Sequence, residues 1–107
     1  MIVAAALSVA PVAADAGPQD LHVIVYSASW CSACQDAKAW MTTANIPFEE
    51  RDIDSSPEYM QQLKSLNRRM SIPTLDIDGK VMVGFYPRQL VWMLQRAVLR
   101  RAAAGVQ

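Results

Sequence analysis

The sequence is poor in cysteine, because its 107 residues include only Cys31 and Cys34, three positions apart. A disulfide between them closes so small a loop that it constrains the unfolded chain little. This excludes a miniprotein held together by disulfide bridges. Two thiols this close together are better suited to act as a reactive pair than as a structural cross-link.

The chain also lacks an excess of charge of either sign, because ten basic residues balance ten acidic ones. Zero net charge leaves no overall basic field that would attract nucleic acid or an anionic membrane over a distance. We therefore expect no nucleic-acid partner. A hydrophobic fraction of 52% and a charged fraction of 19% are typical of one globular domain with a modest core.

No apolar run is long enough for a stable membrane span. The longest, Ile2 to Ala16, is interrupted by Pro11 and Asp15 and resembles the apolar part of a secretory signal with small residues at its cleavage site. No basic residue follows the first methionine, so a flexible tail is the alternative. We interpret residues 1–20 as a signal-like or flexible N-terminal segment, with periplasmic export favoured over a cytoplasmic location, and 21–107 as the folded domain.

Apolar spacing predicts four strands and three helices. Leu21 to Tyr26 is a continuous apolar run, which is typical of a strand buried on both faces. From Cys31 the apolar residues follow helical spacing, and alternation on both sides of Asp78-Gly79 predicts a hairpin. The other expected elements are a linker at 17–20, strands at 48–53, 74–77 and 80–83, and helices that begin at 57 and 87.

The order β-α-β-α-β-β-α predicts an α/β fold in which helices flank a four-stranded mixed sheet. Strands joined by a helix pair in parallel, and the hairpin adds an antiparallel pair. This order places Cys31 directly after a buried strand and at the start of the next helix. Reactive groups in open α/β sheets gather at such strand ends.

The position of the two cysteines predicts thiol–disulfide chemistry. The nucleophile in disulfide exchange is a thiolate, and the free N–H groups and dipole at a helix N-terminus stabilise negative charge. Cys31, as the first helical residue, is expected to point toward solvent and receive this stabilisation. Cys34 lies one turn further along on the buried stripe, so we expect a shielded, less acidic thiol. We predict that Cys31 is the attacking thiolate and Cys34 the resolving thiol.

Two other interpretations of the cysteine pair remain open from the residues alone. Cys-x-x-Cys is half of a structural zinc site, which needs four ligands. His22 is the only other good candidate ligand, and it lies in the first predicted strand, so zinc binding would require two chains. A non-catalytic module with two buried thiols is the remaining interpretation.

Several separated motifs resemble those of glutaredoxins, a branch of the thioredoxin-fold superfamily. They lie at 25–34, 46–52, 71–75, 77–80 and 83–85. The resemblance extends from about Leu21 to Ala97 and implies a thioredoxin-like fold. It implies a monomeric oxidoreductase that reduces or exchanges disulfides in proteins or small thiols. No metal or organic cofactor would be required, and the electron donor would be a reductase or glutathione.

The resemblance also implies which residues contact the substrate. The Ile72–Pro73 peptide bond should be cis and lie against the sulfur atoms, and the backbone of Ile72 should pair with an incoming peptide as an added strand. Trp30 would offer an apolar contact beside the first cysteine. The other residues expected at the substrate site are Ser32, Tyr26, Gly84 and Phe85.

The segment after the fourth strand bears on the electron donor. Glutathione-using glutaredoxins usually carry Gly-Gly and then a polar, acidic pair there, whereas this chain has Gly84-Phe85-Tyr86-Pro87. That form is similar to small glutaredoxin-like proteins that take electrons from thioredoxin reductase. Glutaredoxins with Trp-Cys-Ser at the site can also assemble an iron–sulfur cluster between two subunits with glutathione as a ligand, so a cluster carrier is the alternative function.

Overall fold

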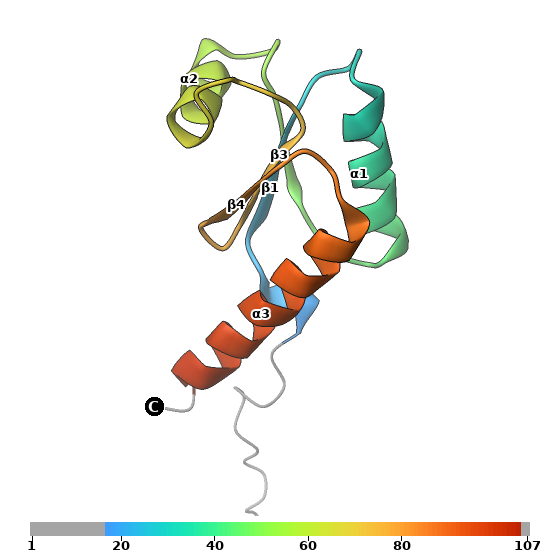
Figure 1. Cartoon of the computed structure of the whole chain (residues 1–107), viewed down its shortest axis with the longest axis vertical. Coiled ribbons are helices and arrows are strands. Elements are labelled where there is room, and N and C mark those ends of the chain that lie inside the picture. The colour runs from blue at the N-terminus through green and yellow to red at the C-terminus, as the bar shows by residue number, and fades with distance from the viewer. Residues whose placement is uncertain (1–16, 106–107) are drawn as a thin grey trace, which may run out of the picture.

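The structure, a computed structural model, describes residues 17–105 (Figure 1). The signal-like part of the N-terminal segment, residues 1–16, lies outside the described residues. Four strands form one sheet in the order β2-β1-β3-β4. They are β1 (Val23–Ser27), β2 (Glu49–Asp52), β3 (Thr74–Ile77) and β4 (Lys80–Val83). β1 pairs in parallel with β2 and antiparallel with β3, and β3 pairs antiparallel with β4. The predicted mixed α/β sheet is therefore confirmed.

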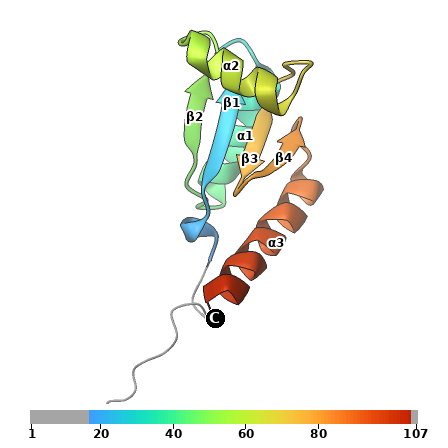
Figure 2. The ribbon, with the colours of Figure 1, turned by 90° about the vertical axis from the view of Figure 1, so that its left-hand side faces the viewer.

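Three helices cover the two faces of this sheet (Figure 2). They are α1 (Ser32–Thr43), α2 (Pro57–Leu66) and α3 (Pro87–Gly105). α1 and α3 lie on one face, where Met41 and Leu90 pack with Val25 and Leu75 in the larger core cluster. α2 lies on the other face, above a smaller cluster. Within residues 17–105, no helix combines the length and apolar character that crossing a membrane requires.

The central strand β1 explains both clusters. All five of its residues are buried, as predicted for a strand covered on both faces. Val25 points into the α1/α3 cluster, while Ile24 and Tyr26 belong to the α2 cluster, as the two-residue repeat of a strand requires. The α2 cluster also contains Cys31 and Cys34, so the cysteine pair is built on the end of the hydrophobic core.

Three local features differ from the sequence expectation. β1 begins at Val23, and His22 before it is exposed rather than buried in the strand. Cys31 is the residue before the first turn of α1, with an extended backbone (φ −97°, ψ 107°), because its sulfur accepts the N–H of Cys34 as a helix cap does. Where a linker was expected, Pro18–Asp20 forms a turn of 3-10 helix whose Asp20 carboxylate accepts the Gly17 N–H at 2.9 Å.

The predicted hairpin turn is present, and it also joins three parts of the chain. Asp78 and Gly79 both have positive φ values, 50° and 90°, as a tight hairpin turn demands. The Asp78 carboxylate accepts the backbone N–H of His22 at 2.7 Å and a guanidinium N–H of Arg101 at 2.9 Å. The turn is thereby connected to the start of β1 and to the last turns of α3.

Candidate active site

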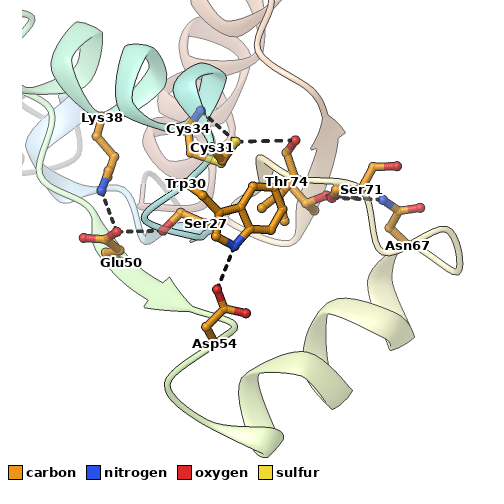
Figure 3. Close-up of a disulfide and its surroundings, with 11 residues drawn as sticks. Ser27, Trp30, Cys31, Cys34, Lys38, Glu50, Asp54, Asn67, Ser71 and Thr74 are labelled. Carbon is orange, nitrogen blue, oxygen red and sulfur yellow. Dashed lines mark hydrogen bonds and ion pairs between the residues drawn. A yellow bond between two sulfur atoms is a disulfide. The ribbon is translucent and has the colours of Figure 1, made fainter.

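Cys31 and Cys34 are joined by a disulfide at the N-terminus of α1 (Figure 3). Their Cα atoms are 5.3 Å apart, and the backbone N–H of Cys34 donates to the Cys31 sulfur at 3.2 Å. In the reduced protein, the same N–H and the helix dipole favour a thiolate on Cys31 over a thiol. The geometry therefore supplies the electrostatic stabilisation that the sequence pattern predicts.

The two cysteines differ in exposure, but by less than the sequence suggests. Cys34 is fully buried, and Cys31 is only 8% exposed although it was expected to point toward solvent. The reason is a tight turn before the helix, in which the Cys31 N–H donates to the Ala28 carbonyl at 3.1 Å and draws the residue inward. Cys31 still has the only exposed part of the pair, so a substrate disulfide can reach this sulfur first.

The loop before β3 lies against the Cys31 sulfur. The Ile72–Pro73 bond is cis, as the resemblance implies, and the Ile72 carbonyl oxygen lies 3.9 Å from Cys31 Sγ. The loop is fixed from both sides. Gly84 donates its N–H to the Pro73 carbonyl at 2.7 Å, and the buried hydroxyl of Thr74 donates to the Ser71 carbonyl at 2.7 Å.

Trp30 forms an apolar surface directly beside the cysteine pair. Its side chain is largely exposed, with a relative exposure of 69%, yet its indole N–H donates to the Asp54 carboxylate at 2.8 Å (Figure 3). Asp54 follows β2, so this bond joins the loop before α1 to the loop before α2. An exposed aromatic ring with a fixed orientation is suited to contact a protein substrate at low entropic cost. Ser32, the first residue of α1, is exposed next to it.

Comparison with known proteins places this arrangement in a family. The sequence model of the glutaredoxin family matches residues 23–82, more than half of the chain. The chain belongs to the glutaredoxin family. Solved structures agree with this, since the glutaredoxin of Methanosarcina mazei Go1 superposes with a TM-score of 0.63 at 26% identity, over 68% of this chain and 77% of that one.

Two curated glutaredoxin-like relatives each match about two thirds of the chain. A glutaredoxin-like 8.6 kDa protein of Clostridium pasteurianum, itself uncharacterized, is 24% identical over 67% of this chain and 96% of its own length. The glutaredoxin-like protein NrdH of Lactococcus lactis is 32% identical over 64% of this chain and 93% of its own length. The thioredoxin-like fold and a redox role for the cysteine pair are therefore those of the glutaredoxin family.

Tyr26 is a predicted substrate residue that the structure does not bring to the surface of this glutaredoxin site. It is 2% exposed, and its hydroxyl accepts an N–H of Arg51 at 3.2 Å. The Arg51 guanidinium lies 5.8 Å from the centre of the Tyr26 ring and 5.7 Å from that of Tyr59. Tyr26 therefore packs beneath α2, and it can influence a substrate only through the position of its neighbours.

Gly84 and Phe85 have different positions relative to the glutaredoxin disulfide. Gly84 has a φ of 95° and bonds to Pro73, and a side chain added to it would meet the Tyr86 ring at 2.8 Å. Glycine is therefore favoured by the backbone conformation, while the exposed Tyr86 side chain could move away from an added methyl group. Phe85 points to the other side, where its ring makes an edge contact with Trp40 of α1 at 6.4 Å between ring centres. It supports the loop from the core instead of lining the sulfur atoms.

A partly buried polar network beside α1 was not found from the sequence. Glu50 of β2 accepts the hydroxyl proton of the fully buried Ser27 and an ammonium proton of Lys38, both at 2.6 Å (Figure 3). The Lys38 side chain is only 18% exposed. The network could have been predicted from the parallel pairing of β1 with β2. This pairing places Glu50 opposite Val25 and thus near the end of β1.

This network predicts a pH-dependent stability. The Lys38 ammonium, and then the Ser27 hydroxyl, hold the pKa of Glu50 below its usual value of 4.5. A carboxylate with a lowered folded pKa stabilises the protein above its unfolded pKa, and this contribution is lost as pH falls through the folded pKa. Glu50→Gln should therefore lower the free energy of unfolding at pH 7 by up to about 1 kcal/mol. The difference should shrink steadily as pH decreases below about 5.

Urea unfolding of both proteins between pH 7 and pH 3 measures this difference. Lys38→Met is the matched variant, because it removes the same ion pair from the other side and leaves the Ser27–Glu50 bond. The double variant should be less destabilised than the sum of the two single variants. A difference between wild type and Glu50→Gln that stays constant over this pH range would contradict the prediction.

The zinc interpretation finds no second pair of ligands in the described part of the chain. Over residues 17–105, no group of three or more His, Cys, Asp and Glu side chains is placed to hold a metal ion. His22 precedes β1, whereas Cys31 follows it, so the two residues lie at opposite ends of the strand. His22 instead has its Nε2 3.7 Å from the Glu49 carboxylate.

Proposed function

We propose that this protein is a dithiol–disulfide oxidoreductase that reduces disulfides in protein substrates. The observation that carries the proposal is the Cys31–Cys34 pair at the N-terminus of α1, where the Cys34 N–H is directed at the Cys31 sulfur. A sulfur in this position ionises readily and is the more exposed of the two. Membership in the glutaredoxin family supports the same chemistry.

The reaction proceeds by two thiol–disulfide exchanges. In the reduced protein, the Cys31 thiolate attacks one sulfur of the substrate disulfide, forms a mixed disulfide and releases the other substrate sulfur as a thiolate. Cys34, as its thiolate, then attacks Cys31 Sγ, and the second substrate sulfur leaves. Two electrons pass to the substrate, and the Cys31–Cys34 disulfide of the structure is formed. One product sulfur takes up the proton of Cys34, and the other takes up a proton from solvent, which replaces the one that Cys31 released on ionisation.

A polypeptide substrate fits the surface around the sulfurs better than a small thiol alone. The Ile72 carbonyl lies beside Cys31 Sγ on a loop fixed by the Gly84 N–H, which supports pairing of the Ile72 backbone with an extended peptide. The exposed Trp30 ring, oriented by Asp54, adds an apolar contact on the other side of the cysteine pair.

The proposed electron donor is a thioredoxin reductase. Binding of glutathione in this family uses an acidic pair after the fourth strand, and no Asp or Glu follows Asp78 in this sequence. In its place the Tyr86 ring covers Gly84, and Phe85 packs against Trp40. The ammonium group of glutathione would find no carboxylate from this segment.

The donor is tested by following NADPH oxidation in two parallel reactions with a small mixed disulfide as substrate. One contains glutathione and glutathione reductase, and the other contains thioredoxin reductase. We expect turnover with thioredoxin reductase and at least tenfold less with glutathione, the factor that corresponds to about 1.4 kcal/mol of lost binding. Cys31→Ser in both reactions gives the background. Equal or faster turnover with glutathione would overturn the proposed donor, and turnover in neither reaction would overturn the proposed function.

A further inference from the structure

The zero net charge of the chain conceals a strong separation of charge. No acidic residue follows Asp78, whereas five basic residues do: Lys80, Arg88, Arg96, Arg100 and Arg101. The first 78 residues therefore contain all ten acidic residues and the other five basic ones. The expectation that the chain offers no basic field is correct for the sum and wrong for this part of the surface.

The structure gathers these basic residues on β4 and α3. Arg101 is paired with Asp78, but within residues 17–105 the other four make no ion pair. Lys80, Arg96 and Arg100 line a groove of about 360 Å³ between β4 and α3. Unpaired cations that lie together raise the local potential and attract an anionic partner.

The outward face of α3 adds exposed apolar side chains to this charge. Trp92 is 58% exposed and Leu99 64%, and their spacing of seven residues places them on the same face of the helix, two turns apart. The Arg96 guanidinium lies 5.2 Å from the centre of the Trp92 ring. The opposite face packs into the core through Leu90, so the helix is fixed with this face toward solvent.

The chain outside the described residues joins the fold next to the same helix. Pro18, two residues after residue 16, lines an apolar groove together with Val91 and Leu99 of α3. Figure 2 shows the turn at Pro18–Asp20 beside α3. The preceding sixteen residues are almost entirely small and apolar in sequence. The described part of the chain therefore begins beside the basic helix.

We propose that the outward face of α3 binds the surface of an anionic lipid bilayer. Trp92 and Leu99 would enter the interfacial region, and Arg88, Arg96 and Arg100 would contact lipid phosphates, as in other interfacial helices. A small apolar surface alone binds a bilayer weakly and reversibly. Stable binding usually also needs a basic patch beside that surface. The combination of exposed apolar side chains and unpaired arginines on one face of the helix favours lipid over an acidic protein.

This orientation leaves the redox site accessible. In Figure 1 the loop between β1 and α1, which carries Cys31, lies at one end of the molecule, and the C-terminal half of α3 lies at the other. A bilayer against the C-terminal half of α3 would therefore lie at the end of the molecule opposite the cysteine pair. The protein would act on disulfides of proteins that lie at the same membrane surface.

Sedimentation of the full chain with lipid vesicles tests the proposal. The probes are vesicles of phosphatidylcholine alone and vesicles that contain 30 mol% phosphatidylglycerol. We expect binding to the anionic vesicles that weakens with added salt. Each basic residue near an anionic surface contributes about a fivefold factor in affinity, so Arg96→Gln/Arg100→Gln should weaken binding about 25-fold. Trp92→Ala should weaken it about tenfold.

Arg68→Gln/Arg69→Gln is the matched control, because it removes two exposed arginines that lie in the loop after α2. It should leave vesicle binding within about twofold of wild type, since charges distant from the bilayer are screened by salt. Equal binding to neutral and anionic vesicles, or equal losses in the two double variants, would overturn the proposal. Retention on immobilised polyglutamate with no binding to anionic vesicles would assign this face to an acidic protein instead and would also overturn it.

Discussion

Replacing Cys31 with serine should abolish disulfide reduction, with a loss of turnover of roughly a thousandfold or more. The reason is that a serine hydroxyl does not ionise near neutral pH, so the N–H of Cys34 has no anion to stabilise and no nucleophile reaches the substrate. NADPH-coupled reduction of a small mixed disulfide measures the loss. Because the substituted side chain differs by one atom, circular dichroism should show the same fold.

The matched variant, Cys34→Ser, should fail in a different way. Cys31 can still attack the substrate, but no thiol remains to resolve the mixed disulfide, so the intermediate accumulates. Mass spectrometry of the intact protein should show the added mass of one substrate half on Cys34→Ser and none on Cys31→Ser. The opposite pattern, with the adduct on Cys31→Ser, would show that Cys34 is the attacking residue. Turnover at the wild-type rate in Cys31→Ser would contradict the mechanism as a whole.

The regular elements could be predicted because each depends on local sequence. The buried run before Ser27 gives β1, and the capping serine at Ser56 followed by proline begins α2 where it was expected, with the Ser56 hydroxyl accepting the Glu58 N–H. The Asp78-Gly79 turn determines the β3–β4 register. In each case the turn, cap or alternation lies within a few residues of the element that it specifies.

The parts of the site that could not be predicted depend on residues far apart in the chain. Asp54 orients Trp30 across 24 positions, and Glu50 joins Ser27 and Lys38 only because β1 and β2 are parallel and adjacent. Sequence spacing carries no information about such contacts until the strand order and register are known. The contact between the Cys31 sulfur and the Ile72 carbonyl has the same origin, since the two residues are 41 positions apart in the sequence.

The distribution of charge on the surface also could not be predicted from the sum of charges in the sequence. A sum over the chain treats Glu49 and Arg96 as cancelling, although one lies on the edge strand β2 and the other on α3 beside the opposite edge strand, β4. Position along the sequence was informative here, because every residue after Asp78 is neutral or basic. Only the fold shows that these residues share one surface with exposed apolar side chains.

Leu63→Ala should cause the largest loss of stability among the predictions made here. Leu63 is fully buried and is the one buried residue of α2, so its packing stabilises the position of the helix on the sheet. It lies in the same cluster as Tyr26, Cys31 and Cys34. Removing a buried leucine side chain leaves a cavity and costs about 2–5 kcal/mol, a large fraction of the roughly 5–15 kcal/mol that stabilises a small domain.

Thermal and urea unfolding of the oxidised protein measure this loss. For a domain of this size, a cost of about 2–5 kcal/mol lowers Tm by roughly 10–30 °C. Leu99→Ala is the matched control, because it removes the same atoms from a side chain that is 64% exposed, and it should change the free energy of unfolding by no more than about 0.5 kcal/mol. An equal decrease in the free energy of unfolding of the two variants would show that Leu63 does not hold α2 against the sheet. Since the cavity would open in the core cluster that contains the cysteine pair, Leu63→Ala should also slow disulfide reduction at temperatures where the variant is still folded, whereas Leu99→Ala should not.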